Sequence, residues 1–187
     1  MASGTLIFLR RLINNPVQVS AIAPSSVFLA RAMAAGITPD TGRVVEFGPG
    51  TGKLTDGILA MGLPPENLTC FELDPIFVRH LLDRLPRVTI VHAGADTAPD
   101  HVAPGVDRVI SGLPLLSMPR PVREAIVGAA FKILAPGGVY VQFTYGQKPA
   151  LDPAQLEALC LQVRFGPKVW LNLPPARVLY YSRIGEG

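Results

Sequence analysis

The sequence lacks the features that would mark a secreted, metal-binding or membrane-spanning chain. Its two cysteines, Cys70 and Cys160, show no metal-ligand spacing, which favours free thiols in a reducing compartment over disulfides or a metal site. No run approaches the ~18–20 consecutive apolar residues that a membrane span needs. The apolar stretch Leu6–Leu9 is followed at once by Arg10 and Arg11 instead of a cleavage site, so no signal peptide is expected. These absences favour a cytoplasmic protein.

Charged residues are also scarce, at 17% of the chain against 49% hydrophobic residues. This composition excludes a disordered chain, and the mean hydropathy of +0.34 indicates contact with something apolar. The formal net charge of +3 and the pI near 9.1 suit a partner with an anionic surface, either lipid or nucleic acid. With 187 residues, the chain is long enough for one domain with a sizeable core.

What the sequence does contain is an alternation of short β-branched runs with helical stretches. This alternation predicts an α/β fold with a mostly parallel, Rossmann-like sheet covered by helices on both faces. The segment 172–175 is too short for a crossover helix, so the last two strands should form an antiparallel hairpin and complete a seven-stranded sheet. Strands are predicted at 44–47, 68–71, 88–91, 108–110, 139–143, 163–171 and 177–184, and helices at 53–61, 74–85, 121–134 and 152–161. Residues 1–40 are predicted to be a helical extension, and 41–187 the sheet domain.

A glycine-rich loop, Glu46-Phe47-Gly48-Pro49-Gly50-Thr51-Gly52, follows the first predicted strand and precedes a helix. Glycine is needed where the backbone turns tightly and approaches a ligand. The loop is not a P-loop, because Lys53 is followed by Leu54. It also differs from the G-x-G-x-x-G of dinucleotide sites, where the charge of Glu46 would be awkward beside pyrophosphate. The E-x-G-x-G-x-G spacing resembles motif I of class I S-adenosylmethionine-dependent methyltransferases.

An acidic residue, Glu72, follows the second predicted strand, where a carboxylate can accept both ribose hydroxyls of an adenosyl group. The methyltransferase resemblance further implies that Leu73 packs on the adenine and that Ala95-Asp96 lie near its amine. Without the loop, Glu72 and Asp96 would be ordinary carboxylates at helix starts. The predicted cofactor is S-adenosylmethionine, with S-adenosylhomocysteine as its product. Its predicted binding residues are Glu46, Gly48, Gly50, Thr51, Gly52, Glu72, Leu73, Ala95, Asp96 and Ser111.

After the fourth predicted strand comes Ser111-Gly112-Leu113-Pro114-Leu115-Leu116-Ser117-Met118-Pro119, and this stretch resembles bacterial phospholipid N-methyltransferases. Members of that family convert phosphatidylethanolamine into phosphatidylcholine by successive methylations. The resemblance covers nearly the whole chain and implies methyl transfer from S-adenosylmethionine to the amine of phosphatidylethanolamine and its methylated intermediates. Its other segments are Phe8–Arg11 through Asn15-Pro16, Ala21–Ser26, Leu29–Met33, Glu46–Lys53 and Asn172–Val178.

Three different functions remain compatible with these motifs. The rRNA adenine N6-dimethyltransferases share the Glu-x-Gly-x-Gly-x-Gly loop, but their later motif resembles Asn-Leu-Pro-Tyr, and Leu115 stands where the base-stacking ring would be. The C-terminal region also lacks the basic, aromatic-rich lobe typical of RNA binding. A methyltransferase for a small amine is the second possibility, and a binding module that has the fold without turnover is the third.

The resemblance also suggests residues for the reaction. Ser111 stands where amine-directed methyltransferases place a short polar residue beside the nitrogen, and Tyr145 is a candidate base or cation–π contact. Arg177 is a candidate to bind the lipid phosphate through two parallel hydrogen bonds from its guanidinium. The plainer interpretation is a solvated arginine at the start of a strand. Tyr180 and Tyr181 face opposite sides of a strand, so at most one of them lines the site. The predicted catalytic residues are Ser111 and Tyr145, the predicted substrate contacts are Ser25, Arg177 and Tyr180, and no metal is expected.

The segment 6–15 is amphipathic when it is placed on a helical wheel, with arginine and asparagine opposite an apolar face. Most such helices pack on their own domain, but a lipid substrate favours a position in the bilayer interface with arginines over anionic headgroups. The expected partners are therefore an anionic membrane and phosphatidylethanolamine, with no nucleic acid, for a monomer at the cytosolic membrane face. The predicted membrane contacts are Phe8, Arg10, Arg11 and Leu12.

Overall fold

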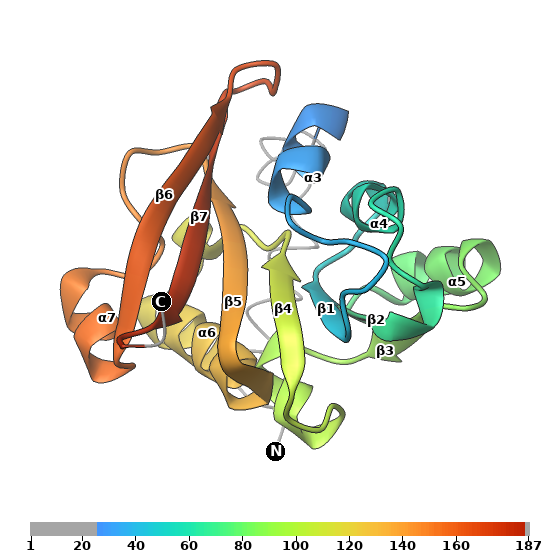
Figure 1. Cartoon of the computed structure of the whole chain (residues 1–187), viewed down its shortest axis with the longest axis horizontal. Helices are drawn as coiled ribbons and strands as arrows, with labels where there is room; N and C mark the ends of the chain where they lie inside the picture. The colour runs from blue at the N-terminus through green and yellow to red at the C-terminus, as the bar shows by residue number, and fades with distance from the viewer. Residues whose placement is uncertain (1–25, 186–187) are drawn as a thin grey trace.

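The structure is a computed structural model that describes residues 26–185. One seven-stranded sheet has the order β3-β2-β1-β4-β5-β7-β6 (Figure 1). Strands β1 to β5 are parallel, and β7 is antiparallel to both β5 and β6, which confirms the predicted mixed sheet and its closing hairpin. The strands are β1 Val44–Phe47, β2 Leu68–Glu72, β3 Thr89–His92, β4 Val106–Ser111, β5 Leu134–Thr144, β6 Leu161–Val169 and β7 Ala176–Arg183. The α-helices are α3 Val27–Met33, α4 Lys53–Leu59, α5 Pro75–Arg84, α6 Arg120–Ile133 and α7 Pro153–Ala158, and the 3-10 helices are η1 Pro65–Asn67, η2 Ala95–Asp100 and η3 Leu115–Ser117.

Local sequence signals account for where several elements begin. Every residue of β1 is buried, as expected for a parallel strand with helices on both faces. Asp74 caps α5 by accepting a hydrogen bond from the backbone N–H of Ile76, with Pro75 in the first helical position. Asp152 and Gln155 form a reciprocal capping box at the start of α7.

The start of β5 differs from the sequence prediction. The sequence predicts that Pro136-Gly137-Gly138 separates helix from strand, but β5 begins at Leu134, directly after α6. The strand accommodates these residues because Gly137 adopts a φ of 73° and the register with β4 shifts between Val106 and Arg108.

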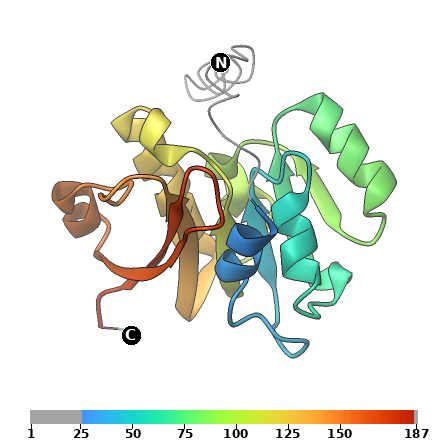
Figure 2. The ribbon, with the colours of Figure 1, turned by 90° about the horizontal axis from the view of Figure 1, so that it is seen from above.

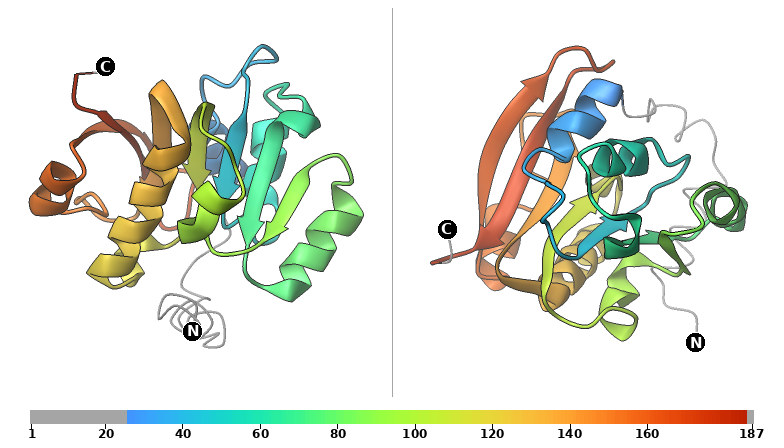
Figure 3. Two further views of the ribbon diagram at one scale, coloured as in Figure 1. Left: turned by 90° about the horizontal axis from the view of Figure 1, so that it is seen from below. Right: turned by 45° about the vertical axis from the view of Figure 1, so that its right-hand side comes forward.

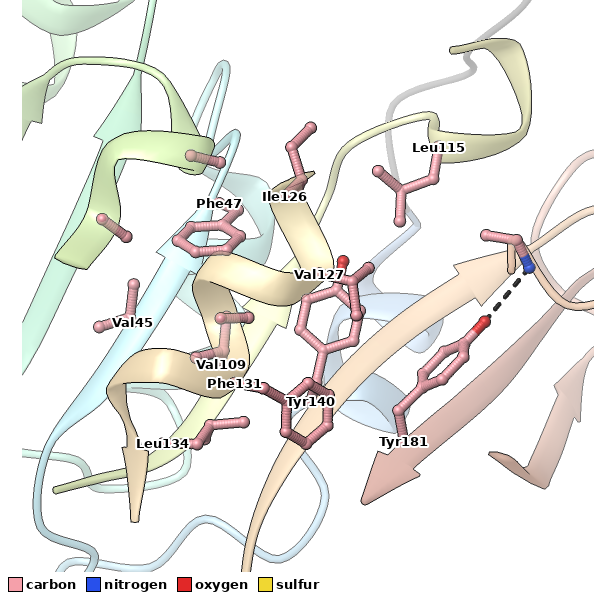
Figure 4. Close-up of a cluster of buried hydrophobic side chains, with 14 of the residues drawn as sticks. Val45, Phe47, Val109, Leu115, Ile126, Val127, Phe131, Leu134, Tyr140 and Tyr181 are labelled. Atoms are coloured by element: carbon pink, nitrogen blue, oxygen red, sulfur yellow. Dashed lines mark hydrogen bonds between the residues drawn. The ribbon is translucent and has the colours of Figure 1, made fainter. Parts of the chain in front are cut away.

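Two hydrophobic cores lie on the two faces of the sheet. One lies beneath α6, and its buried side chains include Phe47, Val109, Val127 and Tyr140 (Figure 4). The other lies beneath α3 and α4. Figures 2 and 3 show these helices on opposite sides of the strands. Among residues 26–185, no helix is both long and apolar enough to cross a membrane.

The parallel strands bring their carboxyl ends to one edge of the sheet. The register places Phe47 of β1 beside Ser111 of β4, and Ser111 beside Gln142 of β5. Because β7 runs the other way, its first residues meet the last residues of β5, with Arg177 opposite Thr144. Ligands of open α/β sheets bind at this edge.

Candidate active site

The glycine-rich loop leaves β1 at the carboxyl edge in conformations that favour glycine. Gly48, Gly50 and Gly52 have φ values of 71°, 54° and 82°, in the left-handed region that other residues enter only at a cost. A Cβ at Gly48 would collide with Leu113, and one at Gly52 would collide with Arg84. A Cβ at Gly50 would meet no heavy atom within 4 Å. Gly50 therefore borders open space in which a ligand can approach the backbone.

Glu72, at the end of β2, is tied to this loop. Its Oε2 accepts a hydrogen bond from the Gly50 N–H at 2.9 Å. Its Oε1 accepts hydrogen bonds from Leu73 N at 2.8 Å and Asp74 N at 2.9 Å. Each carboxylate oxygen can accept two hydrogen bonds, so Oε2 has capacity for a ligand hydroxyl. The structure thus brings Glu72 and the loop together, as a cofactor site would require.

Glu46 is fully buried below the loop, with one oxygen satisfied and the other without a partner. Oε2 accepts hydrogen bonds from Thr55 Oγ1 at 2.7 Å and from Cys70 Sγ at 3.5 Å, whereas Oε1 has none among the described residues. The pKa of Glu46 is raised from 4.5 to about 7, chiefly by burial; the two hydrogen bonds oppose this rise, and the nearby Glu72 and Asp56 carboxylates add to it. A cation or a hydrogen-bond donor beside Oε1 would lower the energetic cost of burying the charged Glu46 carboxylate.

These groups fit the predicted cofactor. Gly50 has no side chain to keep a ligand from the backbone, and Glu72 Oε2 can accept a hydrogen bond from an adenosyl ribose. The carboxylate oxygen Oε1 of Glu46, which has no partner among the described residues, can accept from an amino-acid ammonium group. The role of each residue in binding that cofactor stays a prediction.

The end of β4 lies directly against the glycine loop. Gly112 N donates to Phe47 O at 2.8 Å, and a Cβ at Gly112 would lie 2.8 Å from Gly48 O. A side chain at residue 112 would therefore force the two segments apart. Ser111 is fully buried, and its Oγ accepts a hydrogen bond from Leu113 N at 3.3 Å. Ser111 thus shapes the turn that follows β4.

Two buried polar residues of β5, Tyr140 and Gln142, support the same turn. The Tyr140 hydroxyl donates to Gln142 Oε1 at 2.8 Å, and Gln142 Nε2 donates to Leu113 O at 2.9 Å. Burial raises the pKa of Tyr140, while a hydrogen bond with Ser111 lowers it. Neither residue was predicted as part of the site, although a glutamine inside the apolar run 139–143 is a signal that could have identified it.

A pocket of about 560 Å³ opens beyond the carboxyl end of β5. It brings together Tyr145 and Arg177, two predicted site residues, and adds Lys168, which was not predicted. Burial raises the pKa of Tyr145, and a hydrogen bond with Asn172 lowers it. Among the described residues, the lining holds two cations and no carboxylate, which suits an anionic ligand. Its members are Thr144, Tyr145, Gly146, Gln147, Phe165, Lys168, Pro174, Pro175 and Arg177.

The two neighbouring tyrosines of β7 face opposite sides of the sheet. Tyr181 is buried in the core, with its ring centroid 5.7 Å from that of Tyr140. Tyr180 lies on the other face, with the Arg164 guanidinium 4.6 Å from its ring centroid, and it does not belong to the lining of the 560 Å³ pocket. The substrate role predicted for Tyr180 stays a prediction.

The remaining predicted residues are spread more widely. Leu73 packs at the margin of the core beneath α6, and Ala95 is buried in that core. Asp96 lines a separate hollow of about 440 Å³ with Arg120 and Glu124 of α6. Five predicted residues lie outside residues 26–185, namely Phe8, Arg10, Arg11, Leu12 and Ser25.

The raised pKa of Glu46 predicts how stability depends on pH. Between pH 4.5 and about 7 the unfolded chain loses this proton while the folded protein keeps it, so the free energy of unfolding should fall as pH rises through that window. The full effect is about 3 kcal/mol. In Glu46→Gln this fall should be absent. Denaturant unfolding of both proteins at several pH values measures it, and parallel pH profiles would contradict the assignment.

Comparisons with known proteins agree with this geometry. No family model matches the chain. A curated relative, the ornithine lipid N-methyltransferase of Singulisphaera acidiphila, is 29% identical over 96% of this chain and 96% of its own length. The chain is therefore similar to a lipid N-methyltransferase along almost its whole length.

Solved structures share the fold at low sequence identity. Magnesium protoporphyrin IX methyltransferase from Synechocystis PCC 6803, solved with bound S-adenosylmethionine, has a TM-score of 0.67 and 12% identity over 97% of this chain and 98% of its own. A TehB-like S-adenosylmethionine-dependent methyltransferase from Corynebacterium glutamicum has a TM-score of 0.64 and 13% identity over 98% and 100%. The chain has the class I methyltransferase fold. One of these two structures holds S-adenosylmethionine and the other is named for its dependence on it, which supports the prediction of this cofactor.

Proposed function

We propose that this protein transfers methyl groups from S-adenosylmethionine to the amine of a membrane lipid headgroup. The observation that carries the proposal is the position of the cationic pocket. Arg177 lies opposite Thr144 at the carboxyl edge of the sheet, the edge from which the glycine-rich loop leaves β1. A cofactor on the loop and an anionic headgroup in the pocket would therefore lie at the same edge. The similarity to a lipid N-methyltransferase supports this interpretation.

S-adenosylmethionine, when bound, supplies an electrophilic methyl group on a sulfonium. Glu72 would accept its ribose hydroxyls through Oε2, and Gly50 would leave its backbone open to close approach. Glu46 Oε1 would accept from its positively charged amino group, which favours the ionised carboxylate. We further propose Leu73 and Asp96 as the adenine contacts.

The protein's own task in this reaction is to position a neutral amine, because an ammonium has no lone pair. Holding two reactants in line can remove roughly 7–11 kcal/mol from a barrier. Ser111 orders the turn that borders the loop. Once the substrate nitrogen carries methyl groups and a positive charge, the Tyr145 ring would stabilise it by a cation–π contact.

Arg177 and Lys168 would bind the anionic part of the headgroup. Phosphatidylethanolamine carries a phosphate near its primary amine, and we propose it as the substrate, with stepwise methylation towards phosphatidylcholine at the cytosolic membrane face. Ornithine is the second candidate headgroup, since it pairs an amine with a carboxylate and the relative is named for ornithine lipid.

Leu115 supports a lipid over an adenine substrate. Its side chain is 2% exposed and belongs to the core beneath α6. It therefore offers neither a ring nor a surface on which a base could stack.

Vesicles that differ only in the acceptor lipid test the substrate. Purified protein and labelled methyl donor are mixed with phosphatidylglycerol vesicles that contain either phosphatidylethanolamine or ornithine lipid, and the extracted lipids are separated by mass. We expect mono-, di- and trimethylated phosphatidylethanolamine, and no product with Glu72→Ala, which lacks the ribose acceptor. Labelling of ornithine lipid alone would move the substrate to the second candidate, and unlabelled lipid in both samples would contradict the proposed function.

A further inference from the structure

We propose that the tip of the β6–β7 hairpin and the start of α3 form a docking surface for an anionic lipid bilayer. This surface, called the tip surface below, consists of Val27, Phe28, Trp170, Leu171 and Leu173. The proposal rests on the proposed function for its role in catalysis, and it adds a membrane contact outside the predicted segment 6–15.

The members of the tip surface are large apolar side chains exposed to solvent. Trp170, Leu171 and Leu173 in the hairpin tip are 68%, 69% and 83% exposed, and Val27 and Phe28 in α3 are 64% and 51% exposed. Hydrophobic side chains scattered singly over a surface are ordinary, whereas apolar residues gathered in one place mark an interaction site. The hairpin tip and α3 lie side by side in both Figure 1 and the right panel of Figure 3.

A buried asparagine holds the two parts together. The Asn172 side chain is 2% exposed, although its neighbours in the chain project into solvent. Its Oδ1 accepts a hydrogen bond from Ser26 N at 2.9 Å, and its Nδ2 donates to Pro174 O at 2.8 Å. Leu171 and Leu173 therefore project from a tip that is anchored to α3.

The charges around the tip surface are of one sign. Lys168 and Arg177 face each other across the hairpin next to its tip, Arg31 lies in α3, and neither the hairpin 161–183 nor the segment 26–37 contains an acidic residue. The Lys168 ammonium lies 3.7 Å from the ring centroid of Trp170, which places a cation beside the apolar tip. A cationic rim around an apolar patch complements anionic headgroups over acyl chains.

The position of the tip surface favours a bilayer over a protein partner. Lys168, Pro174 and Pro175 flank the tip and also line the 560 Å³ pocket, so a headgroup in the pocket would stay close to the membrane from which it came. Tryptophan also prefers the interface between water and lipid, because its ring is apolar with a polar N–H.

Trp170 reports directly on this surface because it is the only tryptophan in the chain. On addition of phosphatidylglycerol vesicles, without methyl donor, we expect its emission to shift to shorter wavelength and to be quenched by brominated acyl chains. An unchanged spectrum would overturn the proposal. The proposal would also be overturned if Trp170 were shielded from acrylamide without vesicles, because the tip surface would then be covered by this chain. Shielding that grows with protein concentration would mean that a second copy covers the surface.

The double substitution Leu171→Ser/Leu173→Ser tests the energetic contribution of the tip. Each leucine withdrawn from the interface should weaken vesicle binding by about tenfold, so vesicle flotation should show a loss of roughly 100-fold for the pair. Leu82→Ser is the matched control, because Leu82 is 50% exposed on α5, outside the tip surface, and it should bind as the unsubstituted protein does. Equal binding of the double variant and the control would overturn the proposal.

Methylation assays separate this proposal from the function beneath it. The double variant should lose methylation of lipid in vesicles but keep methylation of the same lipid dispersed in detergent. Equal loss in both media would overturn the docking role, because the tip would then act in the reaction itself. If the unsubstituted protein methylates no lipid in either medium while Trp170 still enters the bilayer, the proposed function fails and the docking surface stands.

Discussion

Gly50→Ala is expected to weaken S-adenosylmethionine binding by about 5- to 150-fold, because the added methyl group occupies the space in which the cofactor would approach the loop. The side chain meets no protein atom within 4 Å, so the effect would come from the ligand and not from a clash within the protein. The left-handed φ of 54° adds a stability cost of about 1–2 kcal/mol. Calorimetric titration with the cofactor and denaturant unfolding measure the two effects separately.

Gly137→Ala is the matched control for this substitution. Gly137 also has a left-handed φ, of 73°, and a Cβ there would also meet nothing within 4 Å. It lies near the amino end of β5, at the opposite edge of the sheet from the loop. Both variants should lose similar stability, while only Gly50→Ala should lose cofactor affinity. Equal affinities in the two variants would remove the loop from the cofactor site.

Arg177→Gln is expected to lower kcat/KM for the lipid by roughly 10- to 150-fold, since hydrogen bonds to charged groups contribute about 1.5–3 kcal/mol each. Arg177 lines the pocket and lies near the Phe165 ring, with 5.7 Å between the guanidinium carbon and the ring centroid. The loss should be mainly in KM, because the headgroup anion does not change during the reaction. Initial rates over a range of lipid mole fractions in vesicles measure both constants.

Arg164→Gln controls for the general loss of positive charge. It removes one charge from the same hairpin, but Arg164 contacts Tyr180 and lies outside the pocket lining. Weaker attraction to an anionic membrane should affect both variants alike, so only the additional loss in Arg177→Gln measures headgroup binding. Equal kinetics in the two variants would mean that Arg177 does not contact the lipid.

The sheet and the loop could be predicted from sequence because their signals are local. The buried run 44–47, the glycines that follow it and the Asp74-Pro75 cap each determine a conformation within a few residues. Glu72 could be added because a parallel sheet places the end of β2 beside the end of β1. In the structure the Gly50 N–H donates a hydrogen bond to Oε2 of the Glu72 side chain, which joins the segments that follow these two strands.

Several parts of the site depend on contacts between distant segments and could not be predicted in this way. Asn172 Oδ1 accepts a hydrogen bond from Ser26 N, 146 positions earlier in the chain, and nothing near either residue in sequence indicates this contact. Lys168 lies opposite Arg177 across an irregular register of the hairpin, and both line the pocket because Arg177 also pairs with Thr144 at the end of β5. The early start of β5 depends on a register shift against β4, and a Pro-Gly-Gly sequence does not indicate it, because such a sequence normally predicts a turn.

The most direct test of the central claim is a competition for the methyl group. Labelled S-adenosylmethionine and purified protein are mixed in one sample with anionic vesicles containing phosphatidylethanolamine, with RNA and with a soluble primary amine, and the label in each fraction is counted. A lipid N-methyltransferase should place the label in the lipid amine, and Gly50→Ala should reduce it far more than Gly137→Ala does. Label in RNA or in the soluble amine, with none in lipid, would contradict the account.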